Sequence, residues 1–454
     1  MKRSFTRRRA AGLALATFVA VCMTAGVPRT ATAAVTGPPP QASSFDHALH
    51  WNTALLKAFR SVQREKASPG RLARAAAMMN IAMHDANWPA APRTYLPRIT
   101  QQNPNDSIEA TMDAAAYGVL RNLFPGVDFT AELNAATAQI PSWVNPAYVA
   151  GGKADGEKIA ALMIAERSGD EPAFDQAYTP DNVPGSWRPT GSGNALDPNV
   201  GRLKPFAMTS GTQFRPQPPA GFSSYDGLLR SSQYADQVNE VKSYGSATST
   251  TRTADQTAAA HFWANDVDGT YKPPGQLLDI TIAVSKAKGL KQAENAELFN
   301  LVSMALADAS IVAWDAKYAT PIDLWRPESA IQSADLDNND ATTADKNWHP
   351  LSTGLSGQPF SPPFPAYISG HATFAGAWAG VMQRWFGHDL TFTAKTEDPY
   401  ATVTERTFTS FEAAAEEDAL SRLYLGVHYR WDADGGLESG FNLGEYVYVT
   451  RRDQ

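Results

Sequence analysis

Long alanine-rich segments with helical spacing constrain the fold of this chain more than any other feature of its sequence. Residues 292–318 read QAENAELFNLVSMALADASIVAWDAKY, and apolar side chains recur there at every third or fourth position. The segment SPGRLARAAAMMNIAMHDANW, residues 68–88, has the same spacing and places Pro69 where a helix can begin. Because alanine has the highest helix propensity and this spacing gathers apolar side chains on one face, both segments are predicted to be helices.

Stretches that alternate polar and apolar residues with a period of two, as strands do, are scarce. Two more helices are expected late in the chain, one after Ser369 and one from about Ser410 to Gly426. Residues 171–226 differ from the predicted helices. They are dense in proline, glycine, serine and asparagine, which predicts long irregular loops. The sequence therefore predicts an all-α fold of helical bundles with long irregular loops.

A short similarity within the chain raises the question of duplication. AMHDA at residues 82–86 resembles ALADA at residues 305–309, each within a long alanine-rich helix. Two related four-helix bundles would explain the similarity, and so would chance recurrence in helices of low complexity. We divide the chain into a signal segment, residues 1–33; an N-terminal helical region with Pro/Gly-rich loops, residues 34–290; and a second helical region, residues 291–454.

The N-terminus has the parts of an export signal. A basic start precedes an apolar run from Ala10 to about Val21, and ATAA near Ala33 resembles a signal-peptidase cleavage site. Paired arginines in TRRRAAGL also fit a twin-arginine signal, so the export route stays open. Cys22, the only cysteine, lies within this segment. The mature chain is therefore expected to be secreted and to contain no disulfide.

The charge of the mature chain argues against polyanionic partners. Removal of the signal segment's six basic residues, which no acid offsets, takes the formal net charge from −7 to −13. An acidic surface repels nucleic acid. A membrane helix needs ~18 apolar residues, and no run of that length is expected after the signal segment. The sequence therefore predicts no stable membrane insertion. The oligomeric state does not follow from the sequence.

Three segments in the last third of the chain carry polar residues suited to a tetrahedral oxyanion. Arginine offers a planar fork of N–H donors that matches the edge of an oxyanion, and lysine adds a point charge. A Ser-Gly-His sequence at a loop-to-helix junction adds a glycine amide and the positive end of the helix dipole. Histidine can bond the central atom or move protons. The residues concerned are Lys317 and Arg326; Ser369, Gly370 and His371; and Arg422, His428 and Asp432.

Each of these residues also has an ordinary structural interpretation. Ser369 could be a helix N-cap and His371 a surface residue, and Arg422 could lie on a solvated helix face. His428 and Asp432, however, are four positions apart. On a continuous helical turn the carboxylate can then hold one ring nitrogen and leave the other free to bond. The ordered combination favours a functional site over a set of unrelated residues.

In this order, the three segments resemble the signature of the superfamily that contains the vanadium-dependent haloperoxidases and the type 2 phosphatidic acid phosphatases. That signature is a lysine, then Arg-Pro, then Pro-Ser-Gly-His, then Ser-Arg followed by a histidine and an aspartate. Flanking segments such as RTADQTAAAHFWA and GTYKPPG are similar to sequences of a secreted bacterial haloperoxidase-like branch of this superfamily. The resemblance covers most of the mature chain and implies a pair of helical bundles.

The resemblance also implies a role for each residue. Vanadate would be the cofactor, and phosphate could occupy the same site. His428 would be the metal ligand that bonds vanadium, or the phosphate nucleophile in a phosphatase. His371 would be the acid/base, and Asp432 would orient His428. The anion's oxygens would be bound by Lys317, Arg326, Ser369, the Gly370 amide and Arg422.

Two positions depart from the signature. Ile368 stands where the signature has the proline that precedes Ser-Gly-His. Lys317 precedes Arg326 by nine positions, where seven is the usual step. Seven residues nearly complete two helical turns and nine do not. Either the two extra residues are absorbed at Pro321, or Lys317 does not reach the pocket.

Three functions are compatible with an oxyanion pocket. An acidic, exported chain without membrane helices favours a secreted vanadate-dependent haloperoxidase, which would oxidise halide with hydrogen peroxide and act on an organic acceptor. One alternative is a secreted acid phosphatase that hydrolyses a phosphate ester through a phosphohistidine. The other is a non-catalytic oxyanion-binding protein. Neither the halide preference nor the organic substrate follows from the sequence.

Overall fold

A computed structural model describes residues 45–87, 93–97, 103–191 and 194–453. The chain divides into two units, Met1–Ala42 and Ser43–Gln454, and the fold described below is that of the second unit. The predicted signal segment and Cys22 lie outside the described residues, so secretion stays a prediction. The predicted division of the chain near residue 290 also stays a prediction.

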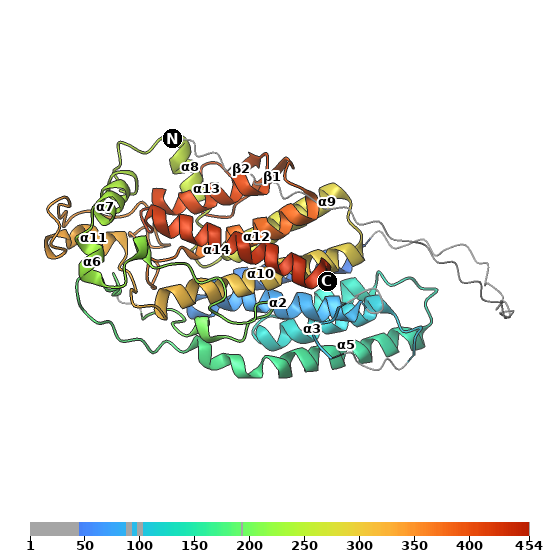
Figure 1. The fold of residues 1–454 in the computed structure, drawn as a ribbon. Coiled ribbons are helices and arrows are strands. Elements are labelled where there is room, and N and C mark those ends of the chain that lie inside the picture. Colours follow the sequence, from blue (N-terminus) through green and yellow to red (C-terminus); the bar gives the residue numbers. More distant parts are fainter. Residues whose placement is uncertain (1–44, 88–92, 98–102, 192–193, 454) are drawn as a thin grey trace, which may run out of the picture. The chain divides into compact units, whose positions relative to one another are not determined.

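Helices dominate the described residues, and the all-α prediction is confirmed (Figure 1). A single two-stranded antiparallel sheet pairs β1 (Phe392–Lys395) with β2 (Glu405–Phe408) in this part of the chain. The region 171–226 is largely irregular, as its composition predicts. The α-helices are α1 (His47–Ser61), α2 (Pro69–Ala86), α3 (Ile108–Leu123), α4 (Thr130–Thr137), α5 (Pro146–Glu166), α6 (Tyr225–Leu229), α7 (Ser232–Tyr244), α8 (Ala254–Phe262), α9 (Lys272–Lys288), α10 (Gln292–Tyr318), α11 (Pro327–Gln332), α12 (Gly370–Phe386), α13 (Phe411–Tyr424) and α14 (Arg430–Tyr448).

Helix α10 lies at the centre of the packing and contacts α1, α2, α9, α12 and α14. Its length and apolar composition would suffice for a membrane span, so the prediction that no apolar run after the signal segment reaches this length is wrong. However, 94% of its most apolar window is buried inside the fold. The helix is buried on all sides because neighbouring helices cover it, as expected for the central element of a helical core.

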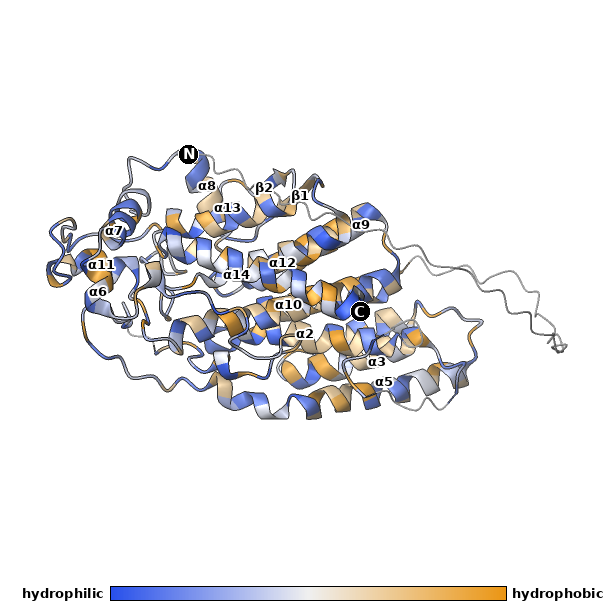
Figure 2. Cartoon of the chain, viewed as in Figure 1, coloured by the Kyte–Doolittle hydropathy of each residue, from blue (hydrophilic) through white to orange (hydrophobic). Residues whose placement is uncertain are grey.

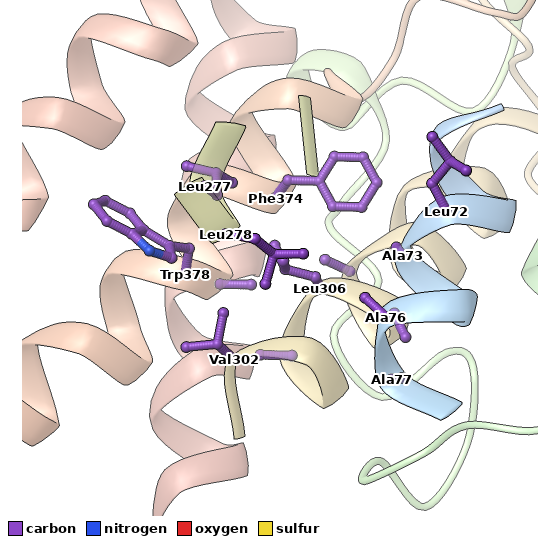
Figure 3. Packing of buried hydrophobic residues seen from close by; sticks show 14 of the residues in the cluster. Leu72, Ala73, Ala76, Ala77, Leu277, Leu278, Val302, Leu306, Phe374 and Trp378 are labelled. Atoms are coloured by element: carbon purple, nitrogen blue, oxygen red, sulfur yellow. The ribbon is translucent and has the colours of Figure 1, made fainter. Parts of the chain in front are cut away.

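The core forms where apolar faces of four helices meet. Figure 3 shows Leu72 and Ala76 of α2, Leu306 of α10 and Phe374 of α12 together with Leu277 of α9, and all five are buried. Figure 2 shows hydrophobic and hydrophilic residues on most helices, which is the pattern of amphipathic helices around such a core. The apolar spacing seen in the sequence thus marks the surfaces that pack.

Helices α12 and α14 approach each other more closely than ordinary side chains allow. Glycines line the contact, and a Cβ atom built on Gly440 would lie only 2.2 Å from the main-chain oxygen of Thr373. On α12, a Cβ atom on Gly376 would lie 2.4 Å from the oxygen of Leu437. This seam fixes the spacing between the beginning of α12 and the beginning of α14, which both belong to the candidate site.

Two buried aspartates fasten loops to the central helices. Asp308 of α10 accepts hydrogen bonds from the backbone N–H groups of Phe206, Ala207 and Met208 at 2.7–2.8 Å. Asp85 of α2 accepts two from the backbone of residues 95 and 96, at 3.2 and 2.7 Å. The two aspartates occupy equivalent places in AMHDA and ALADA, so the short similarity within the chain corresponds to a shared structural role.

Candidate functional site

The predicted site residues come from the ends of five helices, α10 to α14. Lys317 lies in the last turn of α10, and Arg326 directly precedes α11. Ser369 caps α12, and Arg422 lies in the last turn of α13. All of the predicted residues are buried. A small pocket is lined by Gly370, His371, Arg422 and His428, together with the unpredicted residues Pro69, Asp266, Trp314, Pro362, Phe364 and Phe374.

The beginning of α12 is tied to α14. The Ser369 side chain accepts a weak 3.4 Å hydrogen bond from the Ala372 N–H, and the Ser369 N–H donates to the main-chain oxygen of Asp432 at 2.9 Å. Gly370 and His371 are the first residues of α12. Their N–H groups have no partner within the helix and lie at the positive end of its dipole. The helix end therefore offers donors to an anion in the pocket.

Arg326 is held by main-chain oxygens and keeps one free nitrogen. Its Nε donates to the Phe364 oxygen and its Nη1 to the Val427 oxygen, both at 2.7 Å. Nη1 also lies 3.0 Å from His428 Nε2. Nη2 is buried and has no hydrogen-bond partner among the described residues. Burial lowers the pKa of Arg326 to about 9, so the guanidinium stays charged at neutral pH.

Arg422 is the second buried guanidinium of the site. Its Nη2 forms an ion pair with Asp266 Oδ2 at 2.6 Å. Its Nε and Nη1 are buried and have no partner in the described part of the chain. Buried donors without an acceptor are costly. Together with Arg326 Nη2, the site therefore presents three unpaired cationic N–H nitrogens, which an oxyanion would satisfy. On this observation the residues present fit vanadate or phosphate.

His428 and Asp432 form a buried pair. His428 Nδ1 lies 2.8 Å from Asp432 Oδ2, which also accepts the Tyr429 N–H at 3.1 Å. Because the carboxylate takes a proton-bearing nitrogen, we assign the hydrogen to Nδ1 and the lone pair to Nε2. Burial, and then Arg326, lower the pKa of His428 well below its ordinary value. The imidazole is therefore neutral, and Nε2 can bond an electrophilic atom in exchange for the hydrogen bond that it accepts from Arg326 Nη1.

His371 also lines the pocket, at the start of α12. Its Nε2 is 3.1 Å from the Ala264 oxygen and 3.9 Å from Asp266 Oδ1. Burial, and then Arg422, lower the pKa of His371 to about 3. The ring is thus neutral in the site as described. A neutral imidazole beside an anion can accept a proton and return it, because the added negative charge raises its pKa.

Lys317 reaches the neighbourhood of the site despite its nine-residue step. Its Nζ donates to the main-chain oxygens of Pro365 at 2.7 Å, Ala366 at 3.1 Å and Ile368 at 2.5 Å. An ammonium group has three hydrogens, so these carbonyl groups occupy all of them. Lys317 thus holds the loop that leads into Ser369. Oxyanion binding by Lys317 remains a prediction, as do the predicted roles of the other site residues.

Sequence reasoning missed Asp266. This carboxylate follows α8, pairs with Arg422 and lines the pocket. Burial opposes its ionisation, but Arg422 and His371 hold the pKa of Asp266 below its usual range. No motif marks residue 266, and only the fold brings it to a partner 156 positions away.

Comparisons with known proteins show which family and fold this chain resembles. A family model described as the VCPO second helical-bundle domain matches residues 297–454. Vanadium chloroperoxidase of Curvularia inaequalis is 26% identical, with 87% of this chain and 80% of the relative covered. The crystal structure of a bacterial vanadium-dependent iodoperoxidase has 25% identity and a TM-score of 0.71, covering 88% of this chain and 95% of that one. A holo-type bacterial vanadium-dependent chloroperoxidase has 16% identity and a TM-score of 0.64, covering 91% and 96%, and shows a shared fold.

Proposed function

We propose that this chain, which belongs to the superfamily of the vanadium-dependent haloperoxidases, is a vanadate-dependent enzyme that oxidises halide ions with hydrogen peroxide. The observation that carries the proposal is the set of three unpaired guanidinium nitrogens on Arg326 and Arg422, beside the Nε2 lone pair of His428. On the strength of residues 1–33, we further propose that the enzyme is exported.

Each residue has a task in this proposal. When bound, vanadate supplies a Lewis acid that activates hydrogen peroxide toward halide. Arg326 Nη2 and Arg422 Nε and Nη1 would donate hydrogen bonds to the anion and offset its charge. The N–H groups at the start of α12 would add further donors. Asp432 holds Nδ1–H of His428, so Nε2 carries the lone pair that would bond the anion's central atom.

His371 is the residue placed to move protons. The overall reaction converts hydrogen peroxide, a halide ion and a proton into hypohalous acid and water. His371 is neutral in the site as described, so it can first take a proton from the incoming peroxide. The resulting imidazolium, stabilised by the anion and by Asp266 Oδ1 at 3.9 Å, then returns a proton as water leaves.

A phosphatase remains the second candidate, because the His428–Asp432 pair would equally serve a histidine nucleophile. Phosphate has the same charge and shape as vanadate and fits the same donors. In that reaction His428 Nε2 would attack phosphorus and His371 would protonate the leaving alcohol. A third candidate, a binding protein without turnover, needs only the donors.

One experiment separates the three candidates. The purified mature protein is freed of bound anion and assayed with and without added vanadate, for peroxide-dependent oxidation of bromide and iodide and for hydrolysis of p-nitrophenyl phosphate. We expect halide oxidation that requires vanadate and is inhibited by phosphate. Phosphate-ester hydrolysis that vanadate inhibits, with no halide oxidation, would establish the phosphatase instead. Vanadate binding by calorimetry without either activity would leave only the binding protein.

A further inference from the structure

The pocket at the candidate site contains a side chain that the chemistry proposed above does not use and that its product would attack. Trp314 belongs to α10, three residues before Lys317, and only 1% of its surface is exposed. It lines the pocket together with His371, Arg422 and His428. Hypohalous acid formed at a bound anion would therefore arise beside an indole ring.

Among the described residues that line this pocket, Trp314 has the most electron-rich carbon atoms. None of these residues is cysteine or methionine, whose sulfur atoms are the usual targets of oxidants. The other benzene rings are those of Phe364 and Phe374, and indole has a more electron-rich face than phenyl. The two histidines can take up halogen on nitrogen, but they can release it again, whereas a carbon–halogen bond is permanent. A halogen retained in the pocket therefore has a durable target in Trp314.

The indole is held with its six-membered ring against the start of α12. Its Nε1 donates to the main-chain oxygen of Leu196 at 3.1 Å, which anchors the five-membered ring. A Cβ atom built on Gly370 would lie 3.4 Å from Cζ3 and 3.8 Å from Cη2, and no other atom of the indole lies within 4 Å of that position. Phe364 packs against the indole with the ring centres 4.9 Å apart. Cζ3 and Cη2 are thus the indole carbons closest to Gly370, whose N–H is offered to the anion.

We propose that Trp314 is a self-modification site, where hypohalous acid that meets no other acceptor halogenates the six-membered ring of the indole at Cζ3 or Cη2. This inference rests on the proposed function, which supplies the hypohalous acid. The ring carbon attacks the halogen, so a carbon–halogen bond forms and the halogen–oxygen bond breaks. The same carbon then loses its hydrogen as a proton, which leaves with the hydroxide as water. One Trp314 and one hypohalous acid thus give one halotryptophan and one water.

The position of the indole decides which of its carbons reacts. In free indole the carbons of the five-membered ring are the most reactive, and oxidants convert that ring to an oxindole. Groups that are held in contact with a reagent gain a large advantage in rate, and in this pocket Cζ3 and Cη2 hold that place. A halogen on either carbon would crowd Gly370 and the donors at the start of α12. The inference therefore predicts a halogenated six-membered ring, and loss of activity with it.

The test compares hypohalous acid made in the pocket with hypohalous acid added from outside. The full mature protein, reconstituted with vanadate, turns over hydrogen peroxide with bromide and, in a separate run, with iodide. Excess free methionine consumes any hypohalous acid that escapes. Peptide mass spectrometry should then find halogen on Trp314, and Trp143, which is 65% exposed, should stay unmodified. Hypobromous acid added to the resting protein without methionine should give the reverse pattern, because Trp314 is buried.

Two further measurements on the same samples link the modification to its geometry and its effect. Complete enzymatic digestion, followed by chromatography against synthetic halotryptophans, identifies the ring carbon that carries the halogen. The fraction of activity lost should equal the fraction of Trp314 that is halogenated. Both measurements use the wild type, so they decide the inference whether or not a variant folds.

Replacement of Trp314 by phenylalanine should stop this loss of activity during turnover, because a phenyl ring is less electron-rich. Trp378→Phe is the matched control. Trp378 of α12 is also buried and donates its Nε1–H to Thr281 at 3.0 Å, but it does not line the pocket (Figure 3). This control should lose activity as the wild type does, and melting temperatures confirm that each variant is folded.

The outcomes also separate this inference from the proposed function. Halogen on Trp143 or on a pocket histidine in place of Trp314, an oxindole at Trp314, or activity loss without halogenation of Trp314 would overturn the self-modification site. An enzyme that oxidises halide and leaves Trp314 intact would refute that site alone. A protein that oxidises neither halide in the presence of vanadate would refute the proposed function, and the self-modification with it.

Discussion

Two buried His–Asp pairs in this molecule have the same geometry and different surroundings. His47 Nδ1 lies 2.8 Å from Asp113 Oδ1, between α1 and α3, and His428 Nδ1 lies 2.8 Å from Asp432 Oδ2. At the first pair the other donor to the carboxylate is the neutral indole of Trp51, at 2.8 Å. At the second, the lone-pair nitrogen faces the charged Arg326.

The difference between the surroundings of the two pairs shows what distinguishes a candidate anion site from a structural pair. A His–Asp pair by itself orients a ring and stabilises a core, which is sufficient at His47. Near His428, the guanidinium groups of Arg326 and Arg422 add buried cationic nitrogens that have no hydrogen-bond partner among the described residues. Binding of an anion would supply the missing acceptors. Each pair can therefore serve as the control for the other.

The largest expected effect separates the two pairs directly. His428→Ala should weaken vanadate binding by more than about 100-fold, because even outer-shell partners of a metal ligand are worth that much. His47→Ala should leave vanadate affinity unchanged but lower the free energy of unfolding by ~3 to 5 kcal/mol, since it leaves the buried Asp113 carboxylate with only the neutral indole of Trp51 as donor. Calorimetric titration with vanadate and urea denaturation measure the two quantities. A His428 variant that binds vanadate like the wild type would remove the distinction.

The next effect concerns turnover rather than binding. His371→Ala should retain most vanadate affinity while kcat falls by ~10² to 10⁴, the range for a positioned proton-transfer group. Vanadate titration and iodide oxidation on the same preparation measure both. If the variant instead fails to bind vanadate, His371 is a ligand and the division of labour between the two histidines is wrong.

Each arginine should contribute less to vanadate binding than His428 does. Arg326→Ala and Arg422→Ala should each weaken vanadate binding by ~1.5 to 3 kcal/mol, the value of a hydrogen bond to a charged group. Lys317→Ala should weaken it less, because carbonyl groups occupy its three hydrogens. Equal losses for Lys317 and an arginine would show that Lys317 turns from the loop to the anion when one binds.

The last effect is on the pH dependence of stability, and not on binding or turnover. The pKa of His371 is lowered to about 3 in the folded protein, so the unfolded chain binds more protons between roughly pH 6.5 and 3. The corresponding stability is therefore fully present above about pH 6.5 and is lost as the pH falls toward 3. His371→Gln should show a smaller loss of melting temperature between pH 7 and 4 than the wild type. His47→Gln, tested in parallel, separates this effect from a general one; equal slopes for His371→Gln and the wild type would contradict it.

The sequence predicted those features that depend on local spacing. The helical segments follow from apolar periodicity, and the four-residue step from His428 to Asp432 corresponds to a hydrogen bond within one turn. The order of the three motifs in the last third of the chain pointed to the residues that the helix ends bring together. Asp266 escaped prediction because it acts through a contact between the loop that follows α8 and the last turn of α13, far apart in the sequence. The three carbonyl partners of Lys317 escaped it too, because no pattern encodes where main-chain oxygens will lie.

The glycine seam between α12 and α14 makes the geometry of the candidate site sensitive to residues outside it. Gly436 lies nearest the site, where a Cβ atom would come within 2.8 Å of the Ser369 oxygen, and Gly444 lies two turns further along, where it would come within 2.2 Å of the Ala377 oxygen. Because both obstacles are main-chain atoms, a single methyl group at either position would force one helix to shift relative to the other. The absence of a side chain at these positions is therefore a condition for the spacing of groups that the two helices contribute to the pocket.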